Sequence, residues 1–225
     1  MIEFVFFDVD DTLLDFGWSE HTALHRTYRE LGVPLTEDMY ARYHCLNRLC
    51  WQACERGEIT REIMLTARHR QMFQEYGIDR DPGECERRYR KNLGIGHCLT
   101  PHALEILDYL HPRYRLFLAS NGVAETQYSR LDSAGLTPYF EQIFISEDAG
   151  ALKPTPEYFD YCFARIPGVC RERAVLIGDS LSSDIMGGRQ AGIRTIWYNP
   201  NGKAGRDDLL PDWEICDLLE LTSIL

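Results

Sequence analysis

Four short polar motifs contain the residue types and spacings that could do chemistry in this 225-residue chain. They are DVDDTLLD near the start, SNG in the middle, a lysine–proline pair, and GDSLSSD. The side chains of interest in these motifs are Asp8, Asp10, Thr12, Ser120, Asn121, Lys153, Asp179 and Asp184. Each motif alone is a common turn or helix cap, but each here lies just beyond a run typical of a buried strand. The four together therefore indicate a site.

Three of the carboxylates suit a hard divalent cation. Carboxylates held close together repel each other, and they ionise together only beside a cation. At neighbouring strand ends, Asp8, Asp10 and Asp179 would form the oxygen-rich site that magnesium prefers. A cation there would also attract a phosphate group to an otherwise acidic chain. The pattern predicts a Mg²⁺ cofactor and a small phosphorylated metabolite as substrate.

The same motifs supply the groups that phosphoryl transfer needs. A carboxylate is an effective covalent nucleophile, so Asp8 can attack phosphorus. Asp10 can give a proton to the leaving oxygen and later take one from water. The Ser120 hydroxyl and neighbouring main-chain N–H groups can hold phosphoryl oxygens, and Lys153 can neutralise charge.

These residues can meet only if several strands end at one edge of a sheet. Five apolar runs are predicted as buried strands, at 2–7, 115–120, 142–146, 173–178 and 194–198. Helical patterns separate them, and this alternation predicts an α/β fold with a doubly wound, mostly parallel sheet. Ligands bind such sheets at the carboxyl ends of the strands, which is where the motifs lie.

One segment breaks the alternation. Residues 16–95 contain no strand-like run and divide into helical stretches punctuated by glycine. We expect a helical cap there, inserted after the first strand, and a catalytic α/β core formed by residues 1–15 and 96–225.

Composition excludes several classes of protein. The chain has 24 basic and 35 acidic residues, a net charge of −11, so nucleic acids and anionic membranes are poor partners. No apolar run approaches the ~18 residues of a membrane span, and the N-terminal stretch meets an aspartate too early for a signal peptide. We therefore expect a cytoplasmic protein, in which the eight cysteines, without any CxxC pair, are reduced thiols.

The motifs resemble those of a known family. FVFFDVDDTL, LASNG, the pair Lys153-Pro154 and VLIGDSLSSDIMGG are similar to the four motifs of the haloacid dehalogenase superfamily. The resemblance covers the α/β portion, and it places the helical insertion where that family carries its first type of cap. It implies a hydrolase in which Asp8 is the nucleophile and Asp10 is the general acid and base.

The resemblance also implies the remaining roles. Asp179 would bind magnesium together with Asp8 and the main-chain carbonyl of Asp10. Supporting roles fall to Thr12 and Asp184. The positions that match the phosphate-binding residues of the family are Ser120, Asn121 and Lys153.

Within the superfamily, the resemblance points to one branch. Dehalogenases lack an acid/base aspartate at the position of Asp10, and the phosphonate hydrolases need a cap lysine where this chain has only Lys91, at the trailing edge. Two stretches are similar to pyrimidine 5′-nucleotidases, SNGVAETQYSRLDSAGLTPYFEQIFISEDAGALKPTPEYFDY and GDSLSSDIMGGRQAGIRTIWYNP. Those enzymes more often have threonine at the position of Ser120. The resemblance implies a Mg-dependent phosphomonoester hydrolase that forms an aspartyl-phosphate and acts on pyrimidine nucleoside monophosphates.

Two alternatives stay open. One is a phosphoglycolate phosphatase, sugar-phosphate phosphatase or phosphomutase of the same superfamily. The other is a non-catalytic, phosphorylatable binding module, as in receiver domains, although such a switch has no use for the leaving-group acid Asp10.

Substrate choice is expected to come from the cap. Its aromatic residues can either stack on a base or pack the interior of the cap; they include Phe16, Trp18, Tyr43, Trp51 and Phe73. The five histidines of this region are expected to be surface residues without metal-ligand spacing; they are His21, His25, His44, His69 and His97.

Overall fold

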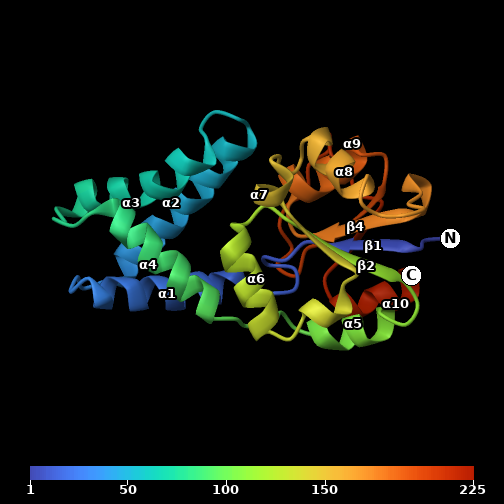
Figure 1. Ribbon diagram of the computed structural model, residues 1–225, viewed down its shortest axis with the longest axis horizontal. Helices are drawn as coiled ribbons and strands as arrows, with labels where there is room; N and C mark the ends of the chain where they lie inside the picture. The colour runs from blue at the N-terminus through green and yellow to red at the C-terminus, as the bar shows by residue number, and fades with distance from the viewer. The chain divides into compact units, whose positions relative to one another are not determined.

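The computed structural model describes all 225 residues of the chain as two compact units. The core unit comprises Met1–Phe16 and His97–Leu225, and the helical unit comprises Gly17–Gly96. Both are visible in Figure 1.

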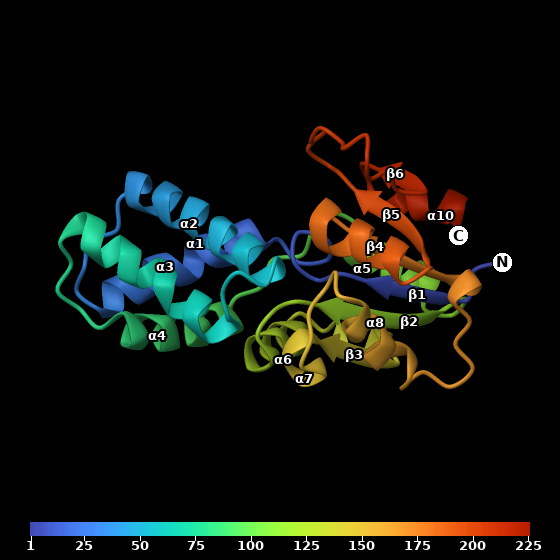
Figure 2. The ribbon, with the colours of Figure 1, turned by 90° about the horizontal axis from the view of Figure 1, so that it is seen from above.

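The core unit is built on a six-stranded sheet with the order β3-β2-β1-β4-β5-β6, in which every pairing is parallel (Figure 2). The strands are β1 (Phe4–Phe7), β2 (Arg115–Ser120), β3 (Gln142–Ile145), β4 (Ala174–Gly178), β5 (Arg194–Tyr198) and β6 (Trp213–Ile215). The predicted doubly wound α/β fold is confirmed. β6 was not predicted from the sequence.

Helices cover both faces of this sheet (Figure 1). Alternate residues of β1 point to opposite faces, so Val5 and Phe7 join one apolar cluster while Phe4 and Phe6 join the other. Because both faces are buried, the strands are unbroken apolar runs. The helices are α5 (Ala103–Leu110) and α10 (Leu221–Ile224) on the first face, α8 (Pro156–Phe163) and α9 (Met186–Gln190) on the second, with α6 (Ala124–Ser133) and α7 (Ser146–Ala149) following β2 and β3.

The helical unit contains no strand. Its helices are α1 (Phe16–Glu30), α2 (Glu37–Glu55), α3 (Arg61–Tyr76) and α4 (Pro82–Ile95). Threonine side chains cap two of them, since Thr36 accepts from the Met39 N–H at 3.2 Å and Thr60 accepts from the Ile63 N–H at 3.4 Å. None of the helices in the chain combines the length and apolar character that a membrane crossing needs.

A chain of buried polar side chains runs through the interior of the helical unit. The Glu86 carboxylate accepts from the Arg68 guanidinium at 2.8 Å and from His69 Nε2 at 2.9 Å. On the other side of the ring, the Cys85 thiol lies 3.4 Å from His69 Nδ1. Burial lowers the pKa of His69 and raises the pKa of Cys85 to about 12. Both shifts favour a neutral imidazole that accepts from the thiol and donates to the carboxylate.

This interior corrects two expectations about the helical unit. His69 is fully buried, so the prediction that it lies at the surface is wrong. Tyr43 and Phe73 are also buried in the unit's own interior, which excludes them as stacking platforms for a substrate. Trp18, by contrast, keeps 46% of its surface exposed.

Candidate active site

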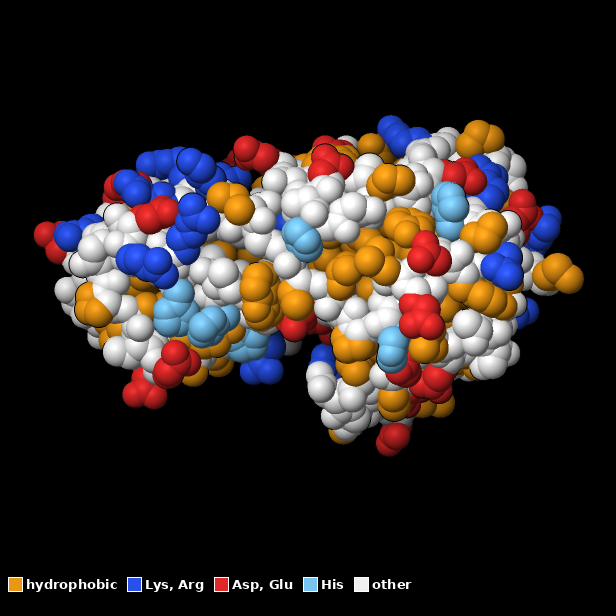
Figure 3. All heavy atoms as spheres, turned by 90° about the horizontal axis from the view of Figure 1, so that it is seen from below, with side chains coloured by type: hydrophobic (Ala, Val, Ile, Leu, Met, Phe, Trp, Pro, Cys, Tyr) orange, Lys and Arg blue, Asp and Glu red, His pale blue; other side chains and the backbone are white.

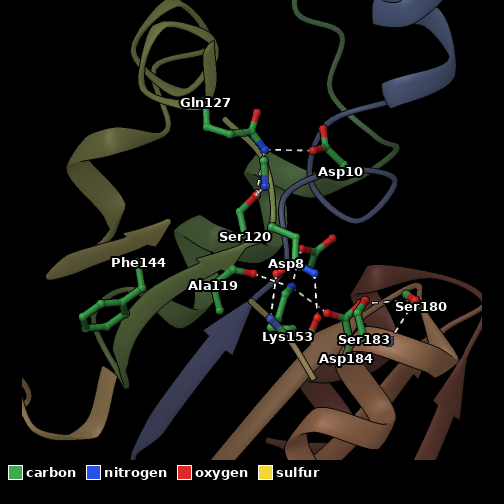
Figure 4. A network of polar contacts seen from close by, with 12 residues as sticks. Asp8, Asp10, Ala119, Ser120, Gln127, Phe144, Lys153, Ser180, Ser183 and Asp184 are labelled. Carbon is green, nitrogen blue, oxygen red and sulfur yellow. Dashed lines mark hydrogen bonds and ion pairs between the residues drawn. The ribbon is translucent and has the colours of Figure 1, made fainter. Parts of the chain in front are cut away.

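The sheet order brings three of the polar motifs to one edge. β1 lies between β2 and β4, and the three strands run in the same direction, so their carboxyl ends meet. Asp8 follows β1, Asn121 follows β2 and Asp179 follows β4. The sheet extends from β1 in both directions, with β2 and β3 on one side and β4, β5 and β6 on the other. Such a reversal of strand order is the switch point at which α/β sheets bind ligands. Figure 4 shows Asp8 at this edge, with Ser120 and Asp184 nearby.

Lys153, from the lysine–proline motif, also reaches this edge. Its side chain is buried, and Nζ donates to Asp8 Oδ1 at 2.7 Å, to Asp184 Oδ1 at 2.6 Å and to the Ala119 carbonyl at 2.5 Å (Figure 4). Burial acts to lower the pKa of Lys153, but the attraction of Asp184 and Asp8 outweighs it and the pKa is raised. The ammonium group therefore stays charged beside the two carboxylates.

The side chain of Asn121 holds Lys153 in place. Asn121 Oδ1 accepts from the Lys153 main-chain N–H at 2.8 Å, and Asn121 Nδ2 donates to the Lys153 carbonyl at 2.9 Å. This paired contact fixes the loop after β3 against the end of β2. The Asn121 amide, predicted at the phosphate site, is thus bonded to the main chain of the residue that carries the ammonium group.

Three carboxylates form a close cluster around this ammonium group. Oxygen atoms of Asp8, Asp179 and Asp184 all lie within 4.8 Å of one another. Burial raises the pKa of Asp8 well above its usual range, against the lowering effect of Lys153. Burial, then repulsion by Asp184, raises the pKa of Asp179 to about 6, although Lys203 Nζ lies 3.0 Å from its Oδ2. The cluster would gain from a further positive charge.

The chemistry of this donor set fits magnesium, because every side-chain donor is a carboxylate oxygen. The set differs in one member from the predicted ligands. The Asp184 carboxylate belongs to it, whereas the Asp10 carboxylate does not. The Asp184 carboxylate can reach this cluster because it packs directly against Gly178. A Cβ atom at position 178 would stand 2.2 Å from Asp184 Oδ2.

Two residues that sequence reasoning missed hold the Asp10 side chain. Gln127 Nε2 donates to Asp10 Oδ2 at 2.8 Å and to Ser120 Oγ at 2.8 Å, and Arg130 Nη1 donates to Asp10 Oδ1 (Figure 4 shows the Gln127 contacts). Arg130 also donates to Gln127 Oε1 at 2.8 Å, and its side chain is buried. Both residues stand three apart on α6, the spacing that places two side chains on one helix face. That spacing, directly after SNG, was the available signal.

A glycine makes room for this arrangement. A Cβ atom on Gly122 would lie 2.5 Å from Cγ of Gln127, so only glycine lets the amide reach Asp10 and Ser120 at once. The SNG motif therefore supplies a hydroxyl, a side chain that fixes Lys153, and space for Gln127.

The loop after β1 positions the two aspartates of the first motif. Asp11 adopts left-handed backbone geometry with φ of 57°, and its Oδ1 accepts from the Phe16 N–H at 2.9 Å. Thr12 is buried, its carbonyl accepts from the Thr100 hydroxyl at 2.7 Å, and its own hydroxyl has no hydrogen-bond partner. Thr12 therefore contacts Thr100 through its main chain and not through its hydroxyl group.

Comparison with known proteins identifies the family. The family model described as haloacid dehalogenase-like hydrolase matches residues 2–192. The chain belongs to the haloacid dehalogenase-like hydrolase family. The prediction that it is a hydrolase of this superfamily is confirmed.

Relatives of this hydrolase match over nearly their whole length. A HAD hydrolase of Bacillus subtilis strain 168, YfnB, is 43% identical over 97% of this chain and 93% of its own. The pyrimidine 5′-nucleotidase PynA of Streptococcus pneumoniae is 34% identical over 99% and 94%. The pyrimidine 5′-nucleotidase YjjG of Escherichia coli is 28% identical over 99% and 97%. A crystal structure of YfnB bound to magnesium superposes with a TM-score of 0.96, at 42% identity, over 100% of this chain and 98% of that one.

Proposed function

We propose that this hydrolase is a magnesium-dependent phosphatase that removes the phosphate from pyrimidine nucleoside monophosphates through an aspartyl-phosphate on Asp8. The observation that carries the proposal is the strand-edge cluster, in which Lys153 bonds Asp8 and Asp184 while Asp10 is held separately by Gln127. A nucleophile beside a cation, with a second carboxylate kept apart from it, is the arrangement that two-step phosphoryl transfer needs.

The cation assigned to this cluster is magnesium. Asp8, Asp179 and the main-chain carbonyl of Asp10 would hold it, with Asp184 beside them, and bound magnesium would neutralise the cluster and the substrate phosphate. The magnesium in the YfnB crystal structure supports this assignment.

The residues of the chain then divide the work. A carboxylate oxygen of Asp8 attacks phosphorus, the bond from phosphorus to the nucleoside oxygen breaks, and Asp10 gives that oxygen a proton. Water then attacks the phosphoryl group on Asp8 while Asp10 takes a proton from it, which releases inorganic phosphate. Both Asp10 oxygens accept hydrogen bonds, one from Gln127 and one from Arg130, which fix the orientation of the carboxyl group. Lys153 stabilises charge on the phosphoryl oxygens throughout.

The substrate class rests on the relatives. PynA and YjjG, both named as pyrimidine 5′-nucleotidases, match almost the entire chain, including the helical unit. The residues assigned to the phosphate lie in the core unit and are indifferent to the base, so the base preference is a separate part of the proposal.

A ranking of substrates by kcat/KM tests the proposal. We expect UMP and dTMP to exceed AMP and GMP by about 10–200-fold, the discrimination that one poorly fitted group usually gives. Phosphoglycolate and glucose 6-phosphate should rank below all four nucleotides. The Asp8→Asn variant, purified in parallel, controls for contaminating phosphatases. A sugar phosphate or phosphoglycolate at the head of the ranking would overturn the nucleotidase assignment and leave the phosphatase chemistry.

A further inference from the structure

Two histidines on α1, in the helical unit, are candidate ligands for a second cation. His21 and His25 are four residues apart, so both lie on one face of the helix, and their ring centroids are 4.2 Å apart. Figure 3 shows histidine side chains gathered on one face of this unit. The expectation that the histidines of this region lack metal-ligand spacing is therefore wrong for this pair, because an i, i+4 pair is a common zinc-binding arrangement.

A carboxylate completes the cluster from the next helix. Glu37 is the first residue of α2, and its side chain is exposed. One Glu37 oxygen lies within 4.8 Å of a ring nitrogen of each histidine, and these two nitrogens lie within 4.8 Å of each other. The ligands thus come from two helices, α1 and α2, joined by the short loop 31–36.

One ring nitrogen of His25 lacks a hydrogen-bond partner, which points to a missing ligand. Its Nε2 atom is buried and has no hydrogen-bond partner, and the nearest acidic oxygen, Glu37 Oε1, stands 3.9 Å away. That separation is too long for a hydrogen bond. A buried imidazole nitrogen without a partner is unfavourable, and a metal ion placed between it and Glu37 would satisfy it without breaking any existing bond.

The donor set selects the kind of metal. Two imidazole nitrogens and one carboxylate oxygen suit zinc and its neighbours in the first transition row, whereas magnesium prefers oxygen ligands alone. Ligands at ~2.1 Å from a tetrahedral ion stand roughly 3.4 Å apart, so no pair of the three ligand atoms needs to approach by more than about 1.4 Å. Partly exposed side chains that are held mainly by ring contacts can make that adjustment; His21, for example, packs edge-on against Tyr40 at 4.7 Å.

We propose that His21, His25 and Glu37 bind one zinc-class divalent ion, with water in the remaining position. The site is separate from the all-carboxylate cluster of the core unit, and the two differ in ligand chemistry, so each takes a different metal from a mixture. Bound zinc would connect α1 to the first turn of α2 and stiffen the helical unit. The proposal is independent of the proposed phosphatase function.

Zinc titration of the whole chain tests the site. Calorimetry or equilibrium dialysis is carried out with magnesium in large excess, so that the core cluster is occupied. We expect one zinc ion per chain, with an affinity that falls about tenfold or more in His21→Gln and in His25→Gln. Glu37→Gln should lose affinity, while its neighbour Asp38→Asn, a matched change in the same helical turn, should keep the parental value. Unchanged stoichiometry and affinity in both histidine variants would overturn the proposal.

A second measurement covers the case in which a variant fails to fold. Imidazole ¹⁵N resonances of the unaltered protein should shift on zinc addition for two histidines, and selective assignment should identify them as His21 and His25. Zinc should also raise the melting temperature of the parent and of Asp38→Asn but not that of His25→Gln. Shifts confined to other histidines, such as the exposed His111, would place the zinc elsewhere and contradict the assignment.

Discussion

The Asp8 carboxylate is held by the only ammonium group that reaches it, Lys153 Nζ at 2.7 Å. Asp8→Asn preserves the shape of this contact but removes the attacking negative charge. We expect turnover of an aryl phosphate with magnesium to fall by several orders of magnitude, about 10³-fold or more. The exposed Asp160, which pairs with Arg171 on the surface, gives a matched control, and Asp160→Asn should retain parental turnover. Turnover of Asp8→Asn within tenfold of the parent would contradict covalent catalysis.

A change of leaving group tests whether Asp10 donates a proton in the reaction or only supports the structure of the site. A nucleoside oxygen needs a proton to leave, whereas nitrophenolate leaves without one. Asp10→Asn should therefore reduce kcat for UMP far more than kcat for p-nitrophenyl phosphate. Steady-state rates on both substrates measure the difference, and equal losses would show that Asp10 acts through structure alone.

Gln127 is expected to act through Asp10. Gln127→Leu keeps the volume but removes the N–H donor shared between Asp10 and Ser120. We expect kcat for UMP to fall about tenfold, because a misdirected catalytic group is costly, while KM changes little and p-nitrophenyl phosphate is affected less. Gln142→Leu, at the start of β3 and remote from Asp10, is the control. A change in KM alone would mean that Gln127 contacts the substrate instead.

Sequence reasoning located the residues of this site unevenly. Asp8, Asp179 and Lys153 were predicted to lie together because four polar motifs, each beyond a predicted buried strand, occur in this one chain. Gln127 and Arg130 were missed, because their spacing of three residues is a weak signal and polar residues on a short amphipathic helix are usually solvated. Only the packing of α6 on the sheet shows that both side chains are buried.

At the scale of the elements, the last residue of β4 packs directly against a carboxylate of the site. This residue, Gly178, leaves no room for a side chain, since a Cβ atom would stand 2.2 Å from Asp184 Oδ2. In Gly178→Ala, Asp184 has to move and its contact with Lys153 is disturbed. We expect about 1–3 kcal/mol lower stability in denaturant unfolding and a higher magnesium concentration for half-maximal activity. Gly205→Ala, where the nearest atom would be an ordinary 3.8 Å away, should change neither. Parental magnesium dependence in Gly178→Ala would show that Asp184 is not part of the metal site.

The elements themselves were predictable to different degrees. Each of the five long apolar runs contains a strand, because burial on both faces demands continuous apolar sequence. β6 is only three residues long, WEI, and its central glutamate is exposed, so no periodicity could reveal it. Its pairing with β5 is what makes it a strand.

For the molecule as a whole, the polar interior of the helical unit predicts a dependence of stability on pH. Burial holds the pKa of His69 below its ordinary value of 6.5, so the unfolded chain binds a proton there more readily than the folded one. Stability is then fully present above pH 6.5 and is lost as the pH falls below it, by up to about 1.4 kcal/mol per pH unit. Unfolding of the parent and of His69→Gln between pH 5 and 8 measures this, and the variant should lack that part of the acid loss. His111→Gln, an exposed histidine, should follow the parent. An unchanged slope in His69→Gln would contradict this account.

The division of the core unit into two stretches of sequence has a consequence for synthesis on the ribosome. β1 lies at the centre of the sheet, between β2 and β4, yet it emerges before both, and β4 begins only at Ala174. At ~5–20 residues per second, the nascent chain carries the bare apolar segment FVFF for roughly ten to thirty seconds before its second partner appears. Such a segment is prone to association with other chains and is a natural client for chaperones during that interval. The helical unit, in contrast, is one continuous stretch and has all of its own partners before β2 is made. The catalytic edge is complete only after Asp184 is added, so any chain released earlier lacks at least β5 and β6 and has no complete cation cluster.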